Sequence, residues 1–220
     1  MPVSVKVRIL PAADGSVDTP KTIAFCQRLE AAGASLLTVH GRTRQQFYTG
    51  RADWDAVGEV KAAVSIPVIV NGDIVTAEEA REALNRSGAD ALMLGRGVYG
   101  RPWLAAHLER ALRDGTRLQE PDREERCGIV IEHMQASLDF YGPGLGLKMF
   151  RKHLGWYVEQ APWPADPLDR RAAKARLCRL DDPAEIAEEL AALWNVSSAS
   201  LTLPGNSAVE KAPQVAEAVG

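Results

Sequence analysis

Residues 67–97 read PVIVNGDIVTAEEAREALNRSGADALMLGRG, and this stretch decides the fold. It starts with an apolar, β-branched run that predicts a buried strand. Thr76 and Glu79 have the spacing of a capping box, so a helix begins there, and Gly88 is placed to end it. A second apolar run at 91–95 predicts another strand. A strand, a helix and a strand in this order predict two parallel strands joined by a helical crossover.

The same alternation extends toward the N-terminus. Residues 2–9 place apolar and polar side chains in turn, with Val5 and Val7 on one face and Lys6 and Arg8 on the other. The predicted strands are 2–9, 36–40, 67–71 and 91–95, and the predicted helices are 18–32, 53–64, 76–88 and 102–115. Strict alternation of strand and helix predicts a parallel sheet.

Four such units do not close a (β/α)8 barrel, which needs eight strands and typically about 250 residues. They form either an open doubly wound sheet or half of a barrel. Glycines follow the last two strands, at Gly72, Gly95 and Gly97. In barrels the loops after strands seven and eight often bind phosphate. If these are strands seven and eight, residues 1–115 hold strands five to eight, the C-terminal half of a TIM (β/α)8 barrel.

Strand signals stop after Gly115. The later helices are predicted at 122–140, 145–160, 167–179 and 182–194. Residues 116–195 are therefore expected to form a separate, small all-helical domain. The tail at 196–220 is rich in Ser, Ala and Pro, a composition typical of disorder.

Composition limits the class of protein. No apolar run approaches the roughly 20 residues that span a bilayer, and the N-terminus lacks the pattern of a signal peptide. The three cysteines, Cys26, Cys127 and Cys178, are far apart, so we expect a reduced cytoplasmic protein with no disulfide and no metal site. The net charge is −3, but residues 146–180 hold eight Lys or Arg against three acidic residues. Such a local basic surface attracts nucleic acid, although it is also compatible with an ordinary solvated face.

Polar side chains gather where the predicted strands end. The four endings are Lys6 with Arg8, His40-Gly41-Arg42-Thr43, Asn71-Gly72-Asp73 and Gly95-Arg96-Gly97. Taken singly, each has an ordinary structural explanation. Parallel α/β folds bind ligands at the carboxyl ends of their strands, so four such endings in succession predict one site. The glycines let backbone N–H groups approach an anion, and Arg96 adds a charge-assisted contact.

The ordered set of motifs resembles the tRNA-dihydrouridine synthases, most closely their bacterial B branch. The motifs are Val5-Lys6-Val7-Arg8, His40-Gly41-Arg42-Thr43, Ile69-Val70-Asn71-Gly72-Asp73-Ile74, Leu92-Met93-Leu94-Gly95-Arg96-Gly97 and Arg151-Lys152-His153-Leu154-Gly155-Trp156-Tyr157. The resemblance covers residues 2–180. It implies an FMN-dependent enzyme that reduces uridine in tRNA to 5,6-dihydrouridine, with NADPH as the reductant.

The resemblance also implies roles for individual residues. Lys6 and His40 are expected beside the flavin ring. The ribityl chain and phosphate of FMN are expected to be bound by Asn71, Gly72, Asp73, Gly95 and Arg96. The residues expected to face tRNA are Arg42, Lys148, Arg151, Lys152 and His153. On a helix Lys148, Arg151 and Lys152 share one face, while Leu147, Leu154 and Val158 pack the opposite side.

The catalytic acid of the resembled family is a cysteine that follows strand four, in an N-terminal half that this sequence lacks. All three cysteines here are predicted inside helices as structural residues. We therefore expect the 220-residue chain alone to be inactive. The alternative is a non-catalytic RNA-binding fragment built on the basic helical domain. A third hypothesis is a different flavin- or phosphate-binding barrel enzyme. The 151–157 segment argues against it, because a metabolic barrel enzyme has no need for such a segment.

Overall fold

Two compact units make up the chain, Met1–Pro121 and Asp122–Gly220. The computed structural model describes residues 1–164 and 166–197. Most of the tail predicted to be disordered, residues 198–220, therefore lies outside the described residues. Each unit is described by itself.

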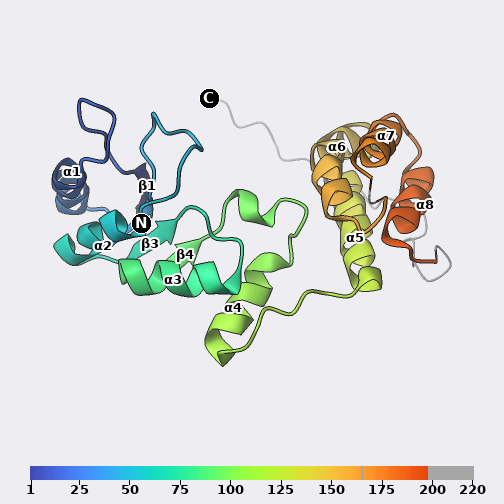
Figure 1. Ribbon diagram of the computed structural model, residues 1–220. Coiled ribbons are helices and arrows are strands. Elements are labelled where there is room, and N and C mark those ends of the chain that lie inside the picture. The colour runs from blue at the N-terminus through green and yellow to red at the C-terminus, as the bar shows by residue number, and fades with distance from the viewer. Residues whose placement is uncertain (165, 198–220) are drawn as a thin grey trace, which may run out of the picture. The chain divides into compact units, whose positions relative to one another are not determined.

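A four-stranded parallel sheet forms the centre of the first unit (Figure 1). Its strands are β1 (Ser4–Arg8), β2 (Leu36–His40), β3 (Val68–Asn71) and β4 (Ala91–Met93), and they are hydrogen-bonded in that order. This confirms the predicted parallel sheet with adjacent strands. β4 is shorter than predicted, since Leu94 and Gly95 have already left the strand.

Helices follow the strands as the sequence predicts. They are α1 (Thr19–Ala31), α2 (Trp54–Ala63), α3 (Ala77–Ser87) and α4 (Leu104–Asp114), with a short 3-10 turn, η1 (Arg96–Val98), after β4. The capping box at the start of α3 is complete, because Thr76 accepts from the Glu79 N–H and the Glu79 carboxylate accepts from the Thr76 N–H. Gly88 ends that helix with φ +58°.

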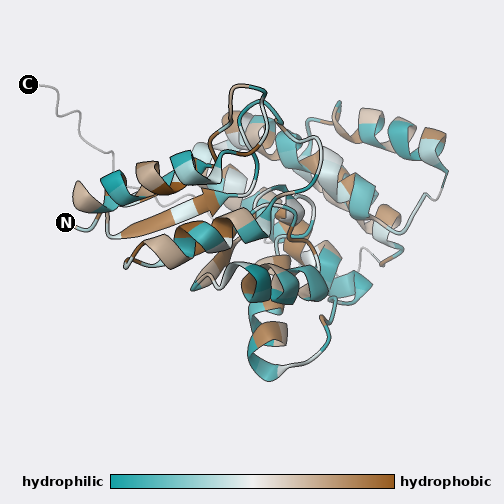
Figure 2. Cartoon of the chain, turned by 60° about the vertical axis from the view of Figure 1, so that its left-hand side comes forward, coloured by the Kyte–Doolittle hydropathy of each residue, from teal (hydrophilic) through white to brown (hydrophobic). Residues whose placement is uncertain are grey.

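The two faces of the sheet differ in polarity. Leu37, Val39, Val68 and Val70 are fully buried in the core formed with the helices, and the strands stand out as apolar segments in Figure 2. Successive strand residues point to opposite faces, so the residues between these apolar ones form the other face. That face is polar toward the carboxyl ends of the strands. A parallel α/β sheet of this kind fits a barrel-type α/β fold.

The second unit contains the four helices predicted for it. They are α5 (Arg123–Tyr141), α6 (Pro143–Gln160), α7 (Pro167–Leu177) and α8 (Pro183–Trp194). α6 packs against α5 and α7, and α8 packs against α5. Gly146 allows the close approach of α6 to α5, since a Cβ there would lie 2.7 Å from the Cα of Leu138. Cys178 was predicted to lie inside this helix, but it follows Leu177, the last residue of α7.

The apolar side of α6 is as predicted. Leu147, Leu154 and Val158 are at most 5% exposed. Among the described residues no helix combines the length and the apolar character that crossing a bilayer would require.

Candidate functional site

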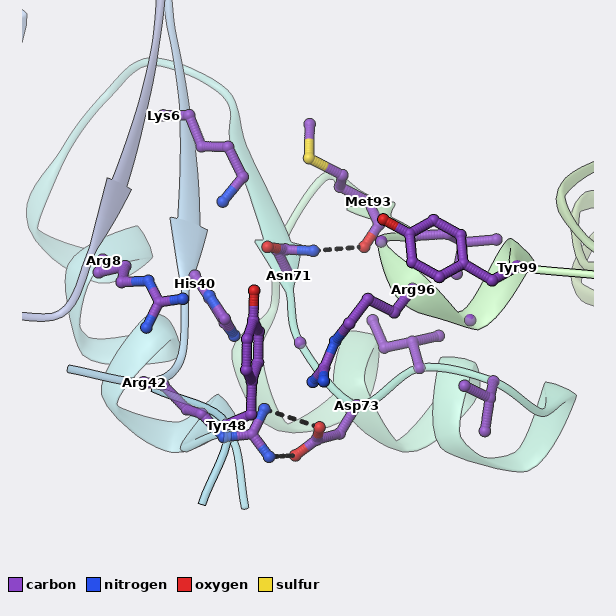
Figure 3. A pocket seen from close by; sticks show the side chains of 16 residues that line it. Lys6, Arg8, His40, Arg42, Tyr48, Asn71, Asp73, Met93, Arg96 and Tyr99 are labelled. Atoms are coloured by element: carbon purple, nitrogen blue, oxygen red, sulfur yellow. Dashed lines mark hydrogen bonds and ion pairs between the residues drawn. The ribbon is translucent and has the colours of Figure 1, made fainter. Parts of the chain in front are cut away.

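A pocket of about 590 Å³ lies at the carboxyl ends of the four strands (Figure 3). Its lining includes all seven residues that the sequence assigned to a cofactor, namely Lys6, His40, Asn71, Gly72, Asp73, Gly95 and Arg96. The lining also includes Arg8, which the sequence placed at the site without a role in binding the cofactor, and Tyr48, Met93 and Tyr99, which it did not assign to the site. Residues from Lys6 to Tyr99 thus meet at one site.

The register of the sheet explains this convergence. Arg8 pairs with His40, His40 with Asn71, and Asn71 with Met93, so these four residues form one row across the four strands. The Asn71 amide nitrogen donates to the Met93 carbonyl at 2.8 Å. That bond fixes the amide and turns its oxygen toward the Lys6 side of the pocket (Figure 3).

Gly72 shapes the floor of the pocket. Its φ is +118°, a conformation that glycine adopts without a steric penalty. A Cβ on Gly72 would lie 2.8 Å from both the Ala52 Cβ and the His40 Cδ2. The Trp54 indole N–H donates to the Gly72 carbonyl at 2.9 Å, and this bond fixes the turn after β3. Only glycine fits both the backbone conformation and the space.

The electrostatics of the pocket favour an anion. Burial and the neighbouring Arg8 lower the pKa of Lys6. Burial, together with Arg8, Lys6 and Arg42, lowers the pKa of His40 to about 4, so this ring is neutral at physiological pH. Burial is the largest cause of both shifts, and an anionic ligand would offset the smaller contribution from the neighbouring cations.

The end of β4 offers further anion contacts. The Arg96 guanidinium lies 3.6 Å from the centre of the Tyr48 ring, and Arg8 lies 5.8 Å from the same ring. A Cβ built on Gly95 meets no atom within 4 Å, so the backbone there is open to a ligand. Within the described residues, no hydrogen bond uses the backbone N–H groups of Arg96 and Gly97. These groups form a donor set suited to a phosphate.

Arg42 and Asp73, which both line the pocket, pair with each other. Arg42 is 3% exposed, and its guanidinium forms two 2.7 Å hydrogen bonds to the Asp73 carboxylate. The side chain of Arg42, which the resemblance assigns to tRNA, is therefore buried against Asp73. The carboxylate of Asp73 is also committed within the protein, since it accepts from the Ala52 N–H at 2.7 Å. Burial alone would raise the pKa of Asp73, but the bonds from Arg42 and Ala52 outweigh it and lower that pKa.

The four residues of α6 assigned to RNA differ in their exposure and contacts. Lys148 and Lys152 are exposed. Arg151 instead donates to the Leu180 carbonyl and, at 2.6 Å, to the Asp181 carboxylate, so it fastens the α7–α8 connection. The assignment of Arg151 to tRNA stays a prediction. His153 is half-buried, with its ring centre 4.7 Å from that of His133.

No cysteine lines this pocket. Cys26 and Cys127 are buried, and burial raises the pKa of each thiol to about 11. The described residues also contain no group of three or more His, Cys, Asp or Glu side chains placed to hold a metal ion.

The fold and the pocket define a parallel α/β protein with a cationic pocket at the carboxyl ends of its strands, where such folds bind ligands. Comparison with known families is more specific, because residues 1–189 match the family model described as dihydrouridine synthase (Dus). The chain belongs to this family.

Curated relatives of the chain carry names from the same family. The chain is 45% identical over 190 residues to a probable tRNA-dihydrouridine synthase of Rhizobium leguminosarum bv. phaseoli, covering 86% of this chain and 55% of the relative. It is 41% identical over 168 residues to tRNA-dihydrouridine synthase B of Pseudomonas putida, covering 70% of this chain and 50% of the relative. The chain thus spans about half the length of the curated relatives it matches. The similarity to a solved mandelate oxidase, at 14% identity and a TM-score of 0.29, is too low to bear on the fold.

Proposed function

We propose that this chain carries the phosphate side of an FMN site in an enzyme that reduces uridine in tRNA to 5,6-dihydrouridine with NADPH. One observation carries the proposal most directly. The seven residues that the family resemblance assigns to the cofactor line a single cationic pocket. The names of the relatives support the tRNA substrate.

The residues present fit an FMN phosphate. Arg96 and the free N–H groups of Arg96 and Gly97 would hold the phosphate, beside the open backbone of Gly95. The Asn71 amide oxygen would accept from a ribityl hydroxyl. When bound, FMN would supply hydride transfer to the uracil ring.

The remaining pocket residues prepare the site. Lys6 places a cation where negative charge on the cofactor would be stabilised. His40 stays neutral at physiological pH, so it offers a hydrogen bond without adding positive charge. Lys6 and His40 thus bind and orient the ligand.

Replacing Arg96 with alanine is expected to weaken FMN binding about tenfold or more, because hydrogen bonds to charged groups contribute about 1.5–3 kcal/mol. Equilibrium dialysis of the full chain measures the affinity. Arg117→Ala removes an exposed arginine of the same unit that lies outside the pocket and should leave binding unchanged. Equal affinities for Arg96→Ala and the unsubstituted chain would show that Arg96 does not bind the phosphate.

We also propose that Lys148 and Lys152 contact tRNA, with His153 beside them. The two lysines are exposed and four residues apart on α6, so they share one face. Arg151 belongs to this proposal only as a residue that anchors the α7–α8 connection behind that face.

The double variant Lys148→Ala/Lys152→Ala is expected to bind tRNA more weakly and with a flatter salt dependence. Each lost phosphate contact lowers the log–log slope by roughly 0.7–0.9, so the pair lowers it by about 1.4–1.8. A titration of the full chain at several salt concentrations gives the slope. Arg110→Ala/Arg117→Ala, which removes two exposed arginines of the first unit, is the matched control. An unchanged slope in the lysine variant would mean that these lysines are only a solvated face.

A second candidate rests on the exposed Lys148 and Lys152 of α6, whose contact with RNA would need no flavin. In this alternative the chain is a non-catalytic RNA-binding protein. It predicts the salt-dependent tRNA binding described above, but no effect of Arg96→Ala on FMN.

A further inference from the structure

We infer that Arg42 and Asp73 form a partly buried clamp that holds residues 43–52, within the connection from β2 to α2, so that Tyr48 lines the pocket. Both are positioning residues in this inference: they act through the 43–52 loop and do not contact the ligand with their side chains. The inference deepens the proposed function, and only its ligand-binding test rests on that function.

The clamp is a bidentate pair between the ends of two neighbouring strands. Arg42 comes two residues after β2 and Asp73 two residues after β3. Both guanidinium–carboxylate bonds are 2.7 Å long, and the Arg42 side chain is 4% exposed against 27% for Asp73. Parallel N–H···O bonds of this kind fix orientation as well as distance. The pair therefore locks the relative position of the two strand ends.

The same two side chains also hold the second half of the loop. Arg42 donates from Nε to the Thr49 carbonyl at 3.2 Å and from Nη2 to the Gly50 carbonyl at 2.7 Å. Asp73 accepts from the Ala52 N–H at 2.7 Å. Three backbone groups within four residues thus depend on one ion pair.

The first half of the loop is anchored separately. The Arg8 guanidinium donates to the carbonyls of Thr43 and Phe47 at 3.0 and 3.1 Å. Tyr48 lies between this anchor and the clamp, and its ring stacks on Arg96. Figure 3 shows the Tyr48 ring standing between Arg8 and Arg96, with the Arg42–Asp73 pair below it. The clamp therefore determines where Tyr48, and with it Arg96, meets the pocket.

The backbone of Asp73 supports this assignment. Asp73 has φ +56°, a left-handed conformation that costs a non-glycine residue energy. Such a conformation persists where the surrounding contacts hold it, and here those contacts are the three bonds to its carboxylate. The Asp73 carboxylate is therefore committed to the Arg42 guanidinium and the Ala52 N–H.

Limited digestion with trypsin tests the clamp on the ligand-free full chain. The loop contains two exposed cleavage sites, Arg44 and Arg51. Asp73→Asn keeps the size of the side chain but places an amide against the guanidinium. Cleavage at these two sites should become about tenfold faster, while cleavage at Arg28 in α1 stays unchanged, because proteolysis follows the population of locally open states.

The control and a second variant make the digestion decisive. Asp55→Asn removes a surface carboxylate that pairs with Arg86, so it should leave the loop protected. Arg42→Lys keeps the charge but loses the fork, and it should open the loop as Asp73→Asn does. Unchanged cleavage at Arg44 and Arg51, or equal acceleration at Arg28, would overturn the inference.

A double-mutant cycle on FMN affinity separates positioning from direct contact. Asp73→Asn and Tyr48→Ala should each weaken binding about tenfold, and the double variant should be no weaker than Tyr48→Ala alone. Additive losses would show that Asp73 contacts the ligand itself and would overturn the positioning role. If the unsubstituted chain does not bind FMN, the proposed function fails, and the digestion alone decides the clamp.

Discussion

Replacing Gly72 with alanine should destabilise the first unit by several kcal/mol and remove ligand binding. Two costs combine. At φ +118° a Cβ strains the backbone, which typically costs about 1–3 kcal/mol. The same Cβ would lie 2.8 Å from the Ala52 Cβ and from the His40 ring, and overpacking of this kind typically costs about 1–3 kcal/mol more. Urea unfolding, followed by amide exchange in β2 and β3, measures the loss.

Gly33 provides a matched control for the two costs. It has φ +97°, but a Cβ there would meet no atom within 4 Å. Gly33→Ala therefore carries the backbone strain without the clash, and it should destabilise the unit by the first amount alone. If Gly72→Ala is no more destabilising than Gly33→Ala, the packing of His40 against Gly72 does not matter for stability.

The sheet and the pocket were predictable because they follow from local patterns. Alternating strand and helix signals force a parallel sheet, and a parallel sheet brings the carboxyl ends of its strands to one edge. Lys6, His40 and Asn71 could therefore be placed together from their positions at the ends of strand patterns. The capping box of Thr76 and Glu79 was equally local.

The contacts that the sequence did not predict involve partners that are distant in sequence. Arg42 lies in the motif that follows β2, and its pairing with Asp73, 31 positions later, buries its side chain. Arg151 was grouped with Lys148 by helical spacing, but its partner Asp181 is 30 positions away. Tyr48 carries no motif of its own, and its place beside Arg96 depends on the path of the loop. Side-chain pairing across loops has no periodic signal.

The 220-residue chain is expected to form dihydrouridine at least about 10²-fold more slowly than a full-length relative. Reduction of the uracil 5,6 double bond adds a hydride to one carbon and a proton to the other, and a positioned general acid typically contributes about 10²- to 10⁴-fold. The family resemblance assigns that acid to a cysteine. In this chain the pocket lining contains no cysteine, and the thiols of Cys26 and Cys127 are buried, with pKa values raised to about 11.

Turnover is measured with the chain, FMN, NADPH and unmodified tRNA, by quantifying dihydrouridine in digested RNA. Lys6 lines the pocket, and it is the residue that we test as a proton source in place of the cysteine. Lys6→Met should therefore remove any residual turnover, whereas Lys152→Met should reduce it only through weaker tRNA binding, which saturating tRNA restores. Turnover at the rate of the relative would contradict the expectation, because the proton would then come from a group that this pocket already holds.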